Sequence, residues 1–484
     1  MKLLNENEKS SRKNKIRSYP ILVLTVFYVG IFVVMLGYIG IYSYKNRQVL
    51  MNNNYNTRQQ ILTTQNKRGN IYAGDGTVLA YSEEDANGDE VRVYPYGREF
   101  AHVLGYATNG RSGLEASENY YLIKCSMDLS EKAEYEQRGE KYPADSLYTT
   151  LDIGLQEVAY KALAARKGAV VVTDPKTGQI LAMVSKPDYD PGTIKQDWED
   201  LVKDTHGEAK LLNRATQGLY PPGSTFKIVT ALAYLKEHEG DYQNYRYTCS
   251  GKFKDGEDVI SCFHGESHGS LDLYSSFAKS CNSSFANIGV DIDRKVFADT
   301  LKELMFNQEQ PLDIAYKKSK ATISAESTTA DVMQLAIGQG TTGVTPMHIN
   351  MITCAAANDG LLMKPYLVKA VKSLDGKVVL KNEPESYKKL MTAEQSRILR
   401  EMMEQVVQNG TATNLKGLSY TSAGKTGSAE FNTATSDSHA WFTGYAPADD
   451  PRICVTIIVE NAGTGGSYAV PIAKRIFDAY FGVE

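Results

Sequence analysis

The sequence has no excess of basic residues of the kind that marks a nucleic-acid-binding protein. Its 53 lysine and arginine residues are outnumbered by 57 aspartate and glutamate residues, and the net charge is −4 at pH 7. Because nucleic-acid binding depends on a basic surface, this composition argues against a nucleic-acid partner. Six cysteines in 484 residues are too few for a disulfide scaffold, whereas 42% hydrophobic residues are typical of globular domains.

Long hydrophobic runs are also scarce, and only residues 21–42 are apolar enough to cross a membrane. This uncharged run of 22 residues would extend about 33 Å as a helix, enough for the hydrocarbon core of a bilayer. Six basic residues precede it within residues 1–20. Because basic flanks stay on the cytoplasmic side, we expect residues 1–20 to be a cytoplasmic tail and everything after the anchor to be extracytoplasmic. No small-residue cleavage site follows, so the anchor is expected to be uncleaved.

Residues 43–148 are predicted to be a β-rich, membrane-proximal module. Residues 68–72 and 77–80 flank a Gly74-Asp75-Gly76 turn and indicate a strand, a turn and a strand. This module shows no nucleophile, acid–base pair or metal-ligand spacing, so we expect it to be a pedestal or dimerisation module rather than a catalytic domain.

Residues 149–484 are predicted to form an α+β domain. Asp152 is a plausible N-cap for an amphipathic helix over residues 153–165. Residues 168–173 and 179–184 are strand-like and are joined by the turn signal Asp174-Pro175-Lys176-Thr177-Gly178. Helical patterns follow to about residue 354, and strands then return before a last helix. We expect strands from both ends of the domain to pair in a single sheet.

A candidate nucleophile stands in the stretch Tyr220-Pro221-Pro222-Gly223-Ser224-Thr225-Phe226-Lys227. The prolines and glycine can start a helix but cannot continue one from upstream. Ser224 and Lys227 are three residues apart and therefore share one helical face. The helix is apolar nearly all round up to residue 235, which indicates burial. A buried lysine has a depressed pKa and can activate a neighbouring serine.

Two further motifs complete the candidate site. Ser280 and Asn282 flank Cys281 at the end of a helical pattern, where a hydroxyl and an amide could relay a proton and orient a peptide. Lys425, Thr426, Gly427 and Ser428 form a Lys-Thr-Gly-Ser segment on an expected edge strand. Such a strand can pair with an extended peptide, with Lys425 as a positive charge and its neighbours receiving a carboxylate. Each motif is weak alone, but their order is specific.

The sequence lacks the features of a Ser–His–Asp hydrolase. No Gly-x-Ser-x-Gly elbow surrounds Ser224, and the histidines outside the cysteine-rich segment suggest no triad. These histidines are His102, His206, His238, His348 and His439.

The three motifs in this order, with further landmarks, resemble the class B, monofunctional penicillin-binding proteins, which are peptidoglycan D,D-transpeptidases. The resemblance covers nearly the whole chain. It implies a transpeptidase domain with an antiparallel sheet that has helices on both faces. One departure is Ala73-Gly74, where the family usually has Asp-Arg. The landmarks are Arg68-Gly69-Asn70-Ile71, Gly113-Leu114-Glu115, Thr149-Thr150-Leu151-Asp152, Asp174-Pro175, Thr177-Gly178, residues 220–227, Gly338-Gln339-Gly340, Trp441-Phe442 and Gly444.

The resemblance also implies a role for each motif residue, the substrates of the enzyme and a membrane partner. Ser224 would be the nucleophile and Lys227 its general base, with Ser280 and Asn282 assisting proton transfer. Lys425 and Thr426 would bind the terminal carboxylate of the substrate, and the backbone N–H groups of Ser224 and Ser428 would form the oxyanion hole. The expected substrates are peptidoglycan stem peptides on lipid-linked glycan strands, β-lactams would acylate the same serine, and no catalytic cofactor is needed. The implied membrane partner is a glycan polymerase of the shape, elongation, division and sporulation (SEDS) family.

A cysteine- and histidine-rich segment precedes the Ser280 motif and leaves two main interpretations open, with free thiols as a third. Cys249, Cys262 and His268 could bind a structural zinc ion. A disulfide between Cys249 and Cys262 is the other interpretation, since the segment is expected outside the cytoplasm. Either bond would brace the helix that carries Ser280.

Three other functions remain open at this point. A β-lactamase shares the fold but rarely has a membrane anchor and an additional module. A β-lactam sensor would need a cytoplasmic signalling domain, and only about 20 residues precede the anchor. An inactive scaffold of a wall-synthesis complex is argued against by the intact motifs. A bifunctional class A enzyme is disfavoured, because residues 43–150 are too few for a glycosyltransferase domain.

Overall fold

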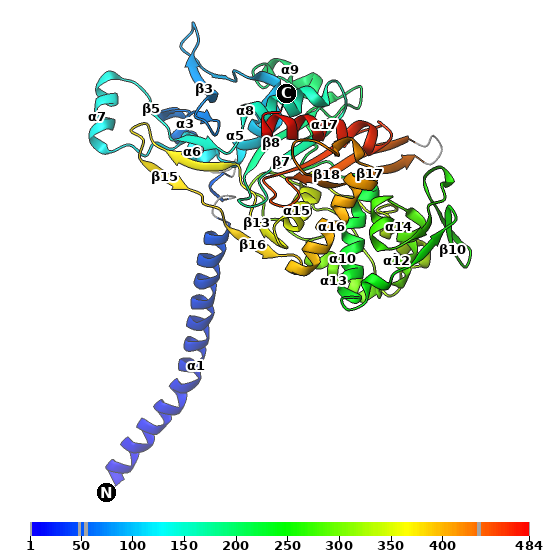
Figure 1. Cartoon of the computed structure of the whole chain (residues 1–484). Coiled ribbons are helices and arrows are strands. Elements are labelled where there is room, and N and C mark those ends of the chain that lie inside the picture. Colours follow the sequence, from blue (N-terminus) through cyan, green and yellow to red (C-terminus); the bar gives the residue numbers. More distant parts are fainter. Residues whose placement is uncertain (1, 47–49, 53–56, 433–436, 484) are drawn as a thin grey trace. The chain divides into compact units, whose positions relative to one another are not determined.

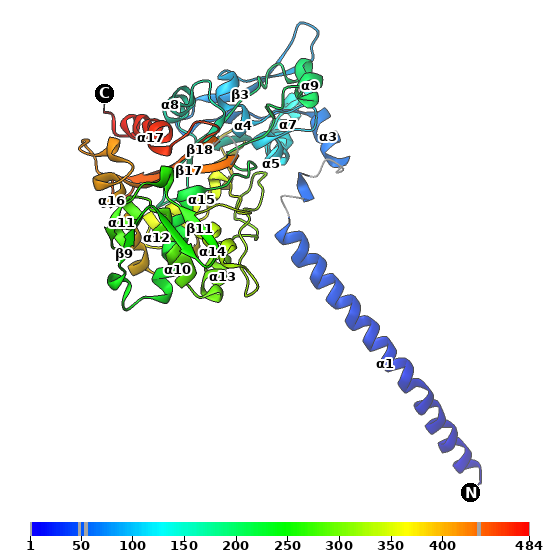
Figure 2. The same ribbon diagram turned by 90° about the vertical axis from the view of Figure 1, so that its right-hand side faces the viewer.

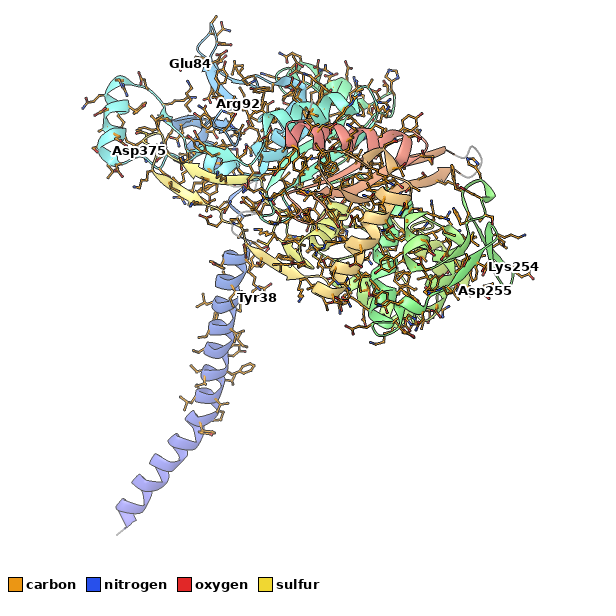
Figure 3. The ribbon with its side chains drawn as sticks, in the orientation of Figure 1. Tyr38, Glu84, Arg92, Lys254, Asp255 and Asp375 are labelled. Carbon is orange, nitrogen blue, oxygen red and sulfur yellow. The ribbon has the colours of Figure 1, made fainter. Side chains whose placement is uncertain are left out.

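This computed structural model describes residues 2–46, 50–52, 57–432 and 437–483. Its contacts divide the chain into two units, residues 1–60 and 61–484. The first unit contains helix α1 (Lys2–Lys45), in which Tyr19–Lys45 has a mean hydropathy of 2.5 and is long and apolar enough to cross a membrane. Its apolar side chains are exposed, as Tyr38 illustrates in Figure 3, which suits a lipid-facing helix. Helix α3 (Thr57–Gln65) contains the division between the units.

A five-stranded antiparallel sheet is the centre of the second unit. Its strand order is β17-β18-β19-β7-β8, so strands from the end of the chain pair with strands from residues 168–186. The prediction that strands from both ends of the domain pair in one sheet is therefore confirmed. The β7–β8 hairpin turns at the predicted Asp174–Gly178 signal, where Asp174 accepts hydrogen bonds from Lys176 and Thr177. The strands are β7 (Gly168–Thr173), β8 (Ile180–Lys186), β17 (Ala423–Asn432), β18 (Asp437–Ala446) and β19 (Ile453–Val459).

Helices cover both faces of this sheet, as Figures 1 and 2 show. Helices α8 (Ile153–Leu163) and α17 (Gly465–Phe481) lie on one face, and α15 (Pro346–Ala357) and α16 (Ala393–Asn409) lie on the other. Asp152 caps α8 as predicted, accepting a hydrogen bond from the Leu155 N–H at 2.8 Å. The second face also carries α10 (Lys227–Glu237), α11 (Leu273–Ala278), α12 (Asn282–Asp291), α13 (Arg294–Glu303) and α14 (Thr329–Ala336).

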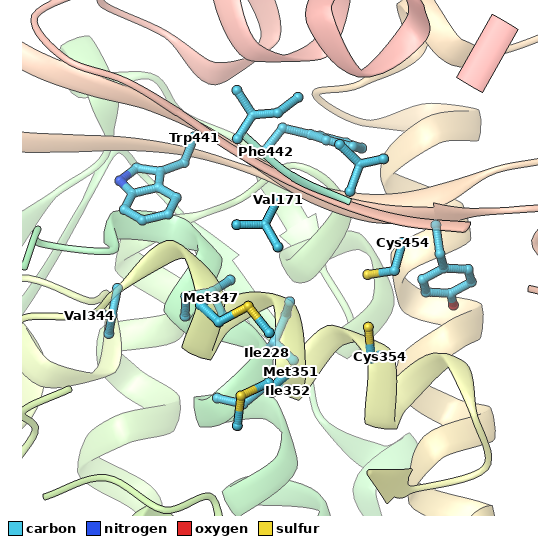
Figure 4. Packing of buried hydrophobic residues seen from close by; sticks show 14 of the residues in the cluster. Val171, Ile228, Val344, Met347, Met351, Ile352, Cys354, Trp441, Phe442 and Cys454 are labelled. Carbon is cyan, nitrogen blue, oxygen red and sulfur yellow. The ribbon is translucent and has the colours of Figure 1, made fainter. Parts of the chain in front are cut away.

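The core lies between the sheet and the helices of the second face. Figure 4 shows Met347 and Met351 of α15 beneath Val171 of β7 and Trp441 of β18. All four side chains are at most 1% exposed. Burial of this kind is worth about 1.5–3 kcal/mol for each large apolar side chain, and it fixes the sheet relative to the helices that carry the site.

A second, six-stranded sheet combines both predicted modules. Its order is β15-β14-β6-β2-β3-β4. The predicted boundary at residues 148 and 149 lies inside β6, whose neighbours on its two sides come from the two modules. The membrane-proximal module and the transpeptidase domain therefore share one sheet and one continuous core. The strands are β2 (Ile71–Tyr72), β3 (Val78–Glu84), β4 (Glu90–Val93), β6 (Ser146–Thr149), β14 (Val368–Lys372) and β15 (Val378–Lys381).

A buried ion cluster explains two of the sequence landmarks. Glu115 is fully buried and accepts hydrogen bonds from Arg68 at 2.6 Å and from Arg92 at 2.7 Å. Burial alone would raise the pKa of Glu115, but the two guanidinium groups outweigh it and lower that pKa. At the departure from the family pattern, Gly74 donates its N–H to Leu151 O at 2.8 Å, and a Cβ there would lie 3.2 Å from that oxygen. A residue with a side chain would press on the segment that leads into α8.

The remaining elements are short. The helical ones are η1 (Gly97–Phe100), α4 (Ala101–Leu104), α5 (Gly113–Ser117), α6 (Asn119–Ile123), α7 (Leu129–Arg138), α9 (Ile194–Lys203), η2 (Gly223–Phe226), η3 (Tyr242–Asn244), η4 (Phe263–Gly265) and η5 (Thr413–Leu415). The strands are β1 (Asn66–Lys67), β5 (Tyr142–Pro143), β9 (Tyr247–Cys249), β10 (Lys252–Asp255), β11 (Asp258–Ser261), β12 (Gly269–Leu271), β13 (Leu361–Met363) and β16 (Ser386–Lys389). The β10–β11 hairpin is marked by Lys254 and Asp255 in Figure 3.

Candidate active site

Ser224 lies in a single 3₁₀ turn, η2, directly before α10. The predicted helix therefore begins in 3₁₀ rather than α geometry. Residues three apart eclipse each other in a 3₁₀ turn, so Ser224 and Lys227 still lie on one side. Ser224 is partly exposed, whereas Lys227 and the next eight residues of α10 are buried.

Close backbone contacts hold this turn in place. Gly223 has φ +51° and donates its N–H to Gly338 O at 2.9 Å. Gly338 itself has φ +74°, and a Cβ there would lie 2.2 Å from Gly223 O. Neither position accommodates a side chain. The indole N–H of Trp441 donates to Pro221 O at 3.1 Å, which ties the preceding prolines to β18.

An ion pair beside the turn adds a further anchor. The Tyr220 hydroxyl donates to Glu460 Oε1 at 2.7 Å, and the guanidinium of Arg214 donates to the same oxygen at 2.8 Å. Arg214 is 4% exposed, and two of its other N–H groups bind backbone oxygens. The Arg214 guanidinium partly offsets the cost of burying this carboxylate, which holds Tyr220 four residues before Ser224.

Ser280 lies between two buried lysines. Lys227 Nζ donates to Ser280 O at 2.7 Å and to Asn282 Oδ1 at 2.7 Å, and lies 3.3 Å from Ser280 Oγ. Lys425 Nζ donates to Ser280 Oγ at 2.8 Å and to Thr426 O at 3.0 Å. Ser280 occupies the joint between α11 and α12 with φ +56°, a left-handed conformation that a non-glycine residue adopts only when its surroundings hold it there.

Burial determines the protonation of the two lysines. It lowers the pKa of Lys227 to about 7. Burial, and then the charge of Lys227, lowers the pKa of Lys425 well below its ordinary value. Two ammonium groups on one hydroxyl repel each other, which favours the state in which one amine is uncharged and can accept a proton. In the part of the chain that the structure describes, no hydrogen bond joins Ser224 to Lys227.

The Lys-Thr-Gly-Ser segment lies on β17, the edge strand of the five-stranded sheet. Gly427 allows the strand to approach the nucleophile turn, since a Cβ there would lie 3.1 Å from both Pro222 O and the Thr225 methyl group. A Cβ on Gly223 would likewise lie 2.8 Å from Ser428 O. Lys425 is fully buried and its amine is hydrogen-bonded to Ser280 Oγ, so its predicted role as a charge at a substrate carboxylate stays a prediction. Thr426 and Ser428 line the open cleft.

A cleft of about 1100 Å³ joins these residues. It is large enough for an extended peptide and not only for a small molecule. The cleft is lined by Ser224, Ser280, Asn282, Thr426, Gly427 and Ser428, and by Gln339, Thr411, Glu430 and Gly465. The candidate residues from the three sequence motifs are thus brought together at one place, with Lys227 and Lys425 directly behind the cleft wall.

The predicted metal ligands gather directly behind the Ser280 motif. The ligand atoms of Cys249, Cys262 and His268 lie with Cys281 Sγ within 4.8 Å of one another. Cys262 Sγ is 3.7 Å from Cys249 Sγ and 3.6 Å from Cys281 Sγ, and Cys249 Sγ is 3.5 Å from His268 Nδ1. Disulfide sulfurs lie about 2.05 Å apart, so these thiols are free. Tetrahedral zinc with Zn–S of about 2.3 Å requires sulfurs about 3.8 Å apart, which the cluster matches.

Cys281 is the ligand candidate that the sequence did not indicate. The sequence presents it only as the middle of the Ser280-Cys281-Asn282 motif, 13 residues after His268. Its side chain points away from the cleft because Ser280 and Asn282 occupy the side that faces Lys227. The one available signal was that Cys281 is the third cysteine, after Cys249 and Cys262, in a span of 33 residues that also contains His268.

Comparisons with known proteins agree with this geometry. Residues 168–478 match the family model of the penicillin binding protein transpeptidase domain, and residues 68–135 match that of the penicillin binding protein A dimerisation domain. The peptidoglycan D,D-transpeptidase PbpA of Mycolicibacterium smegmatis is 32% identical over 449 residues, which cover 85% of this chain and 89% of the relative.

Solved structures are similar over most of the chain. The penicillin G acyl-enzyme complex of penicillin-binding protein A from M. tuberculosis has a TM-score of 0.77 and 28% identity, covering 86% of this chain and 100% of that chain. A D,D-transpeptidase domain from Eggerthella lenta also has a TM-score of 0.77, with 31% identity and coverage of 87% and 99%. By its family-model match over most of its length, and by these relatives, the chain belongs to the penicillin-binding protein transpeptidase family.

Proposed function

We infer that the chain is a peptidoglycan D,D-transpeptidase that cross-links stem peptides through a serine acyl-enzyme. The observation that carries this inference is the array of Ser224, Lys227, Ser280 and Lys425 at one cleft in a member of the transpeptidase family. The array supplies a nucleophile, a buried amine with a pKa of about 7, and a hydroxyl that connects the two amines. These are the parts that acyl transfer requires.

In the first step Ser224 Oγ attacks the carbonyl carbon of the bond between the two terminal D-alanines. Lys227 accepts the serine proton as the Oγ–C bond forms, since its amine is partly neutral at pH 7. Breaking the C–N bond releases D-alanine, whose amine must gain a proton. Ser280, which contacts both lysines, is placed to deliver that proton from Lys227 or Lys425.

In the second step an amine of a neighbouring stem peptide attacks the acyl carbon. The amine loses a proton to the same lysine and serine array, the ester bond to Ser224 breaks, and the serine regains its hydrogen. The new amide bond is the cross-link.

The backbone N–H groups of Ser224 and Ser428 are our candidates for the oxyanion hole, because the Gly223–Ser224 turn lies against β17 at Ser428.

The lifetime of the penicillin adduct tests this function against its alternatives. We expect penicillin G to add its whole mass to one residue, and we expect this adduct to last far longer than the turnover time of a β-lactamase. Intact mass measured over time reports both the adduct and its loss. Fast drug consumption without a lasting adduct would indicate a β-lactamase, and no reaction would indicate a scaffold.

We also propose that the chain binds one structural zinc ion. Cys249, Cys262, His268 and Cys281 supply three sulfurs and one nitrogen at separations that suit one tetrahedral ion. The fourth ligand, Cys281, stands between Ser280 and Asn282, so a metal bound there would brace the loop that carries both. This support from the separations favours zinc over the Cys249–Cys262 disulfide.

The remaining proposals concern the membrane. The basic residues before the α1 span support a cytoplasmic N-terminus and an extracytoplasmic catalytic unit. Protease added outside intact cells should then digest the catalytic unit. Protection of the catalytic unit from this protease would contradict the proposed topology. A SEDS-family glycan polymerase remains the proposed partner, and failure of the full-length chain to co-purify with such a polymerase from membranes would reject it.

A further inference from the structure

The loop between α16 and β17 brings a threonine that the sequence motifs did not include into the active-site cleft. Thr411 Oγ1 makes a short hydrogen bond with Thr426 Oγ1 of the Lys-Thr-Gly-Ser segment. Among the described residues, each of these two hydroxyls has the other as its protein partner. Thr426 is 5% exposed, and both residues line the cleft.

Close packing places Thr411 accurately. A Cβ on the preceding Gly410 would lie 2.3 Å from Ala278 O, so this loop presses directly on the end of α11, two residues before Ser280. On the other side, a Cβ on Gly466 would lie 2.9 Å from Thr411 O. The loop is therefore held between α11 and the first turn of α17 (Gly465–Phe481). Such a position leaves Thr411 little freedom to move away from Thr426.

The contact between the two hydroxyls affects how Thr426 can bind a carboxylate. A threonine hydroxyl has one hydrogen to donate and two lone pairs to accept. If Thr426 donates to Thr411, it has no hydrogen left for the substrate. When a carboxylate takes the hydrogen of Thr426, Thr411 can donate into Thr426 instead. The Thr411 hydroxyl thereby orients the Thr426 hydrogen toward the cleft and strengthens the bond by polarising it.

We propose that Thr411 is a positioning residue that sets the Thr426 hydroxyl to bind the terminal carboxylate of the donor peptide. This inference rests on the proposed function, since it assumes that the donor carboxylate binds at β17. It follows that Thr411 contributes to recognition of the carboxylate and not to proton transfer at Ser224. Its loss should therefore weaken binding more than it slows the chemical step.

A cycle of one substitution and one ligand change tests the proposal. The protein variants are wild type and Thr411→Val, which keeps the shape of the side chain and removes the hydroxyl. The ligands are penicillin G and its methyl ester, which lacks the negative charge. We expect Thr411→Val to lower the second-order rate of acylation by penicillin G about tenfold, the size expected for a hydrogen bond that supports a charged acceptor. Most of this loss should appear in the half-saturating concentration.

The ester gives the readout that a merely structural effect would not give. With the methyl ester, wild type and Thr411→Val should differ by less than about twofold. Thr411→Ser keeps the hydroxyl and should restore most of the rate with penicillin G. Thr421→Val is the matched control, because its hydroxyl hydrogen-bonds to Asp449 at 3.2 Å outside the cleft.

Two results would overturn the proposal. One is an equal loss with both ligands, which would indicate general damage to the site. The other is no loss with penicillin G. If wild type itself forms no adduct with either ligand, the proposed function fails before Thr411 is tested, so the two failures are distinguishable.

Discussion

Replacing Lys227 by methionine is expected to slow acylation of Ser224 by penicillin G by about 10²–10⁴-fold, the range that general acid–base catalysis supplies. Methionine has nearly the length of the lysine stem and fills the same buried space, but it cannot accept the serine proton. It also removes the hydrogen bonds to Ser280 O and Asn282 Oδ1. The measurement is the acylation rate constant from intact mass at saturating drug.

The matched control is Lys236→Met on the same helix. Lys236 pairs with Glu303 away from the cleft, so its loss should leave the acylation rate unchanged.

The acylation rate of the wild type should also depend on pH. The neutral amine of Lys227 is the reactive form, and its pKa of about 7 means that the rate falls about tenfold for each pH unit below 7. An unchanged rate in Lys227→Met, or a pH-independent rate between pH 5 and 8, would remove Lys227 from the role of base.

Replacing Cys281 by alanine is expected to release zinc from the chain. The purified wild-type protein should contain one zinc ion per chain, held by Cys249, Cys262, His268 and Cys281. Loss of a residue that merely orients a ligand costs about 10–100-fold in metal affinity, and loss of a ligand should cost more. Metal analysis after dialysis against a chelator measures this directly. The unfolding temperature should fall as well, because the metal binds the folded state.

Cys125→Ala is the control for this experiment, since Cys125 lies in the membrane-proximal module and outside the cluster. It should keep one zinc per chain. Acylation by penicillin G should slow in Cys281→Ala, because a metal bound by Cys281 would brace its two neighbours, Ser280 and Asn282. Zinc-free wild-type protein whose mass shows two hydrogens fewer at Cys249 and Cys262 would instead establish the disulfide.

The sequence predicted those parts of the site that depend on local spacing. Ser224 and Lys227 are three residues apart, so any helical geometry places them together, even though the turn is 3₁₀ rather than α. The Asp174–Gly178 hairpin and the Asp152 cap also depend only on neighbouring residues. Family resemblance then supplied the roles.

Long-range packing decided the rest. The surroundings of Lys425 come from α11 and α12, more than 130 residues earlier, so its full burial could not be read from the Lys-Thr-Gly motif. Cys281 joins the cysteine cluster only because Ser280 and Asn282 take the opposite side of the chain. Thr411 reaches Thr426 because Gly410 permits contact with Ala278. The boundary at residues 148 and 149 lies within a shared sheet for the same reason, since β6 pairs with strands from both modules.

Cross-linking by the intact, membrane-inserted chain tests the central claim most directly. Full-length protein would receive a glycan strand whose stem peptides end in D-Ala-D-Ala and carry an acceptor amine. Release of D-alanine and formation of the cross-linked peptide dimer would be followed by mass spectrometry, beside Ser224→Ala. We predict that wild type releases one D-alanine for each dimer and that Ser224→Ala forms neither product. Dimer formation by Ser224→Ala, or D-alanine release by wild type without any dimer, would contradict the account.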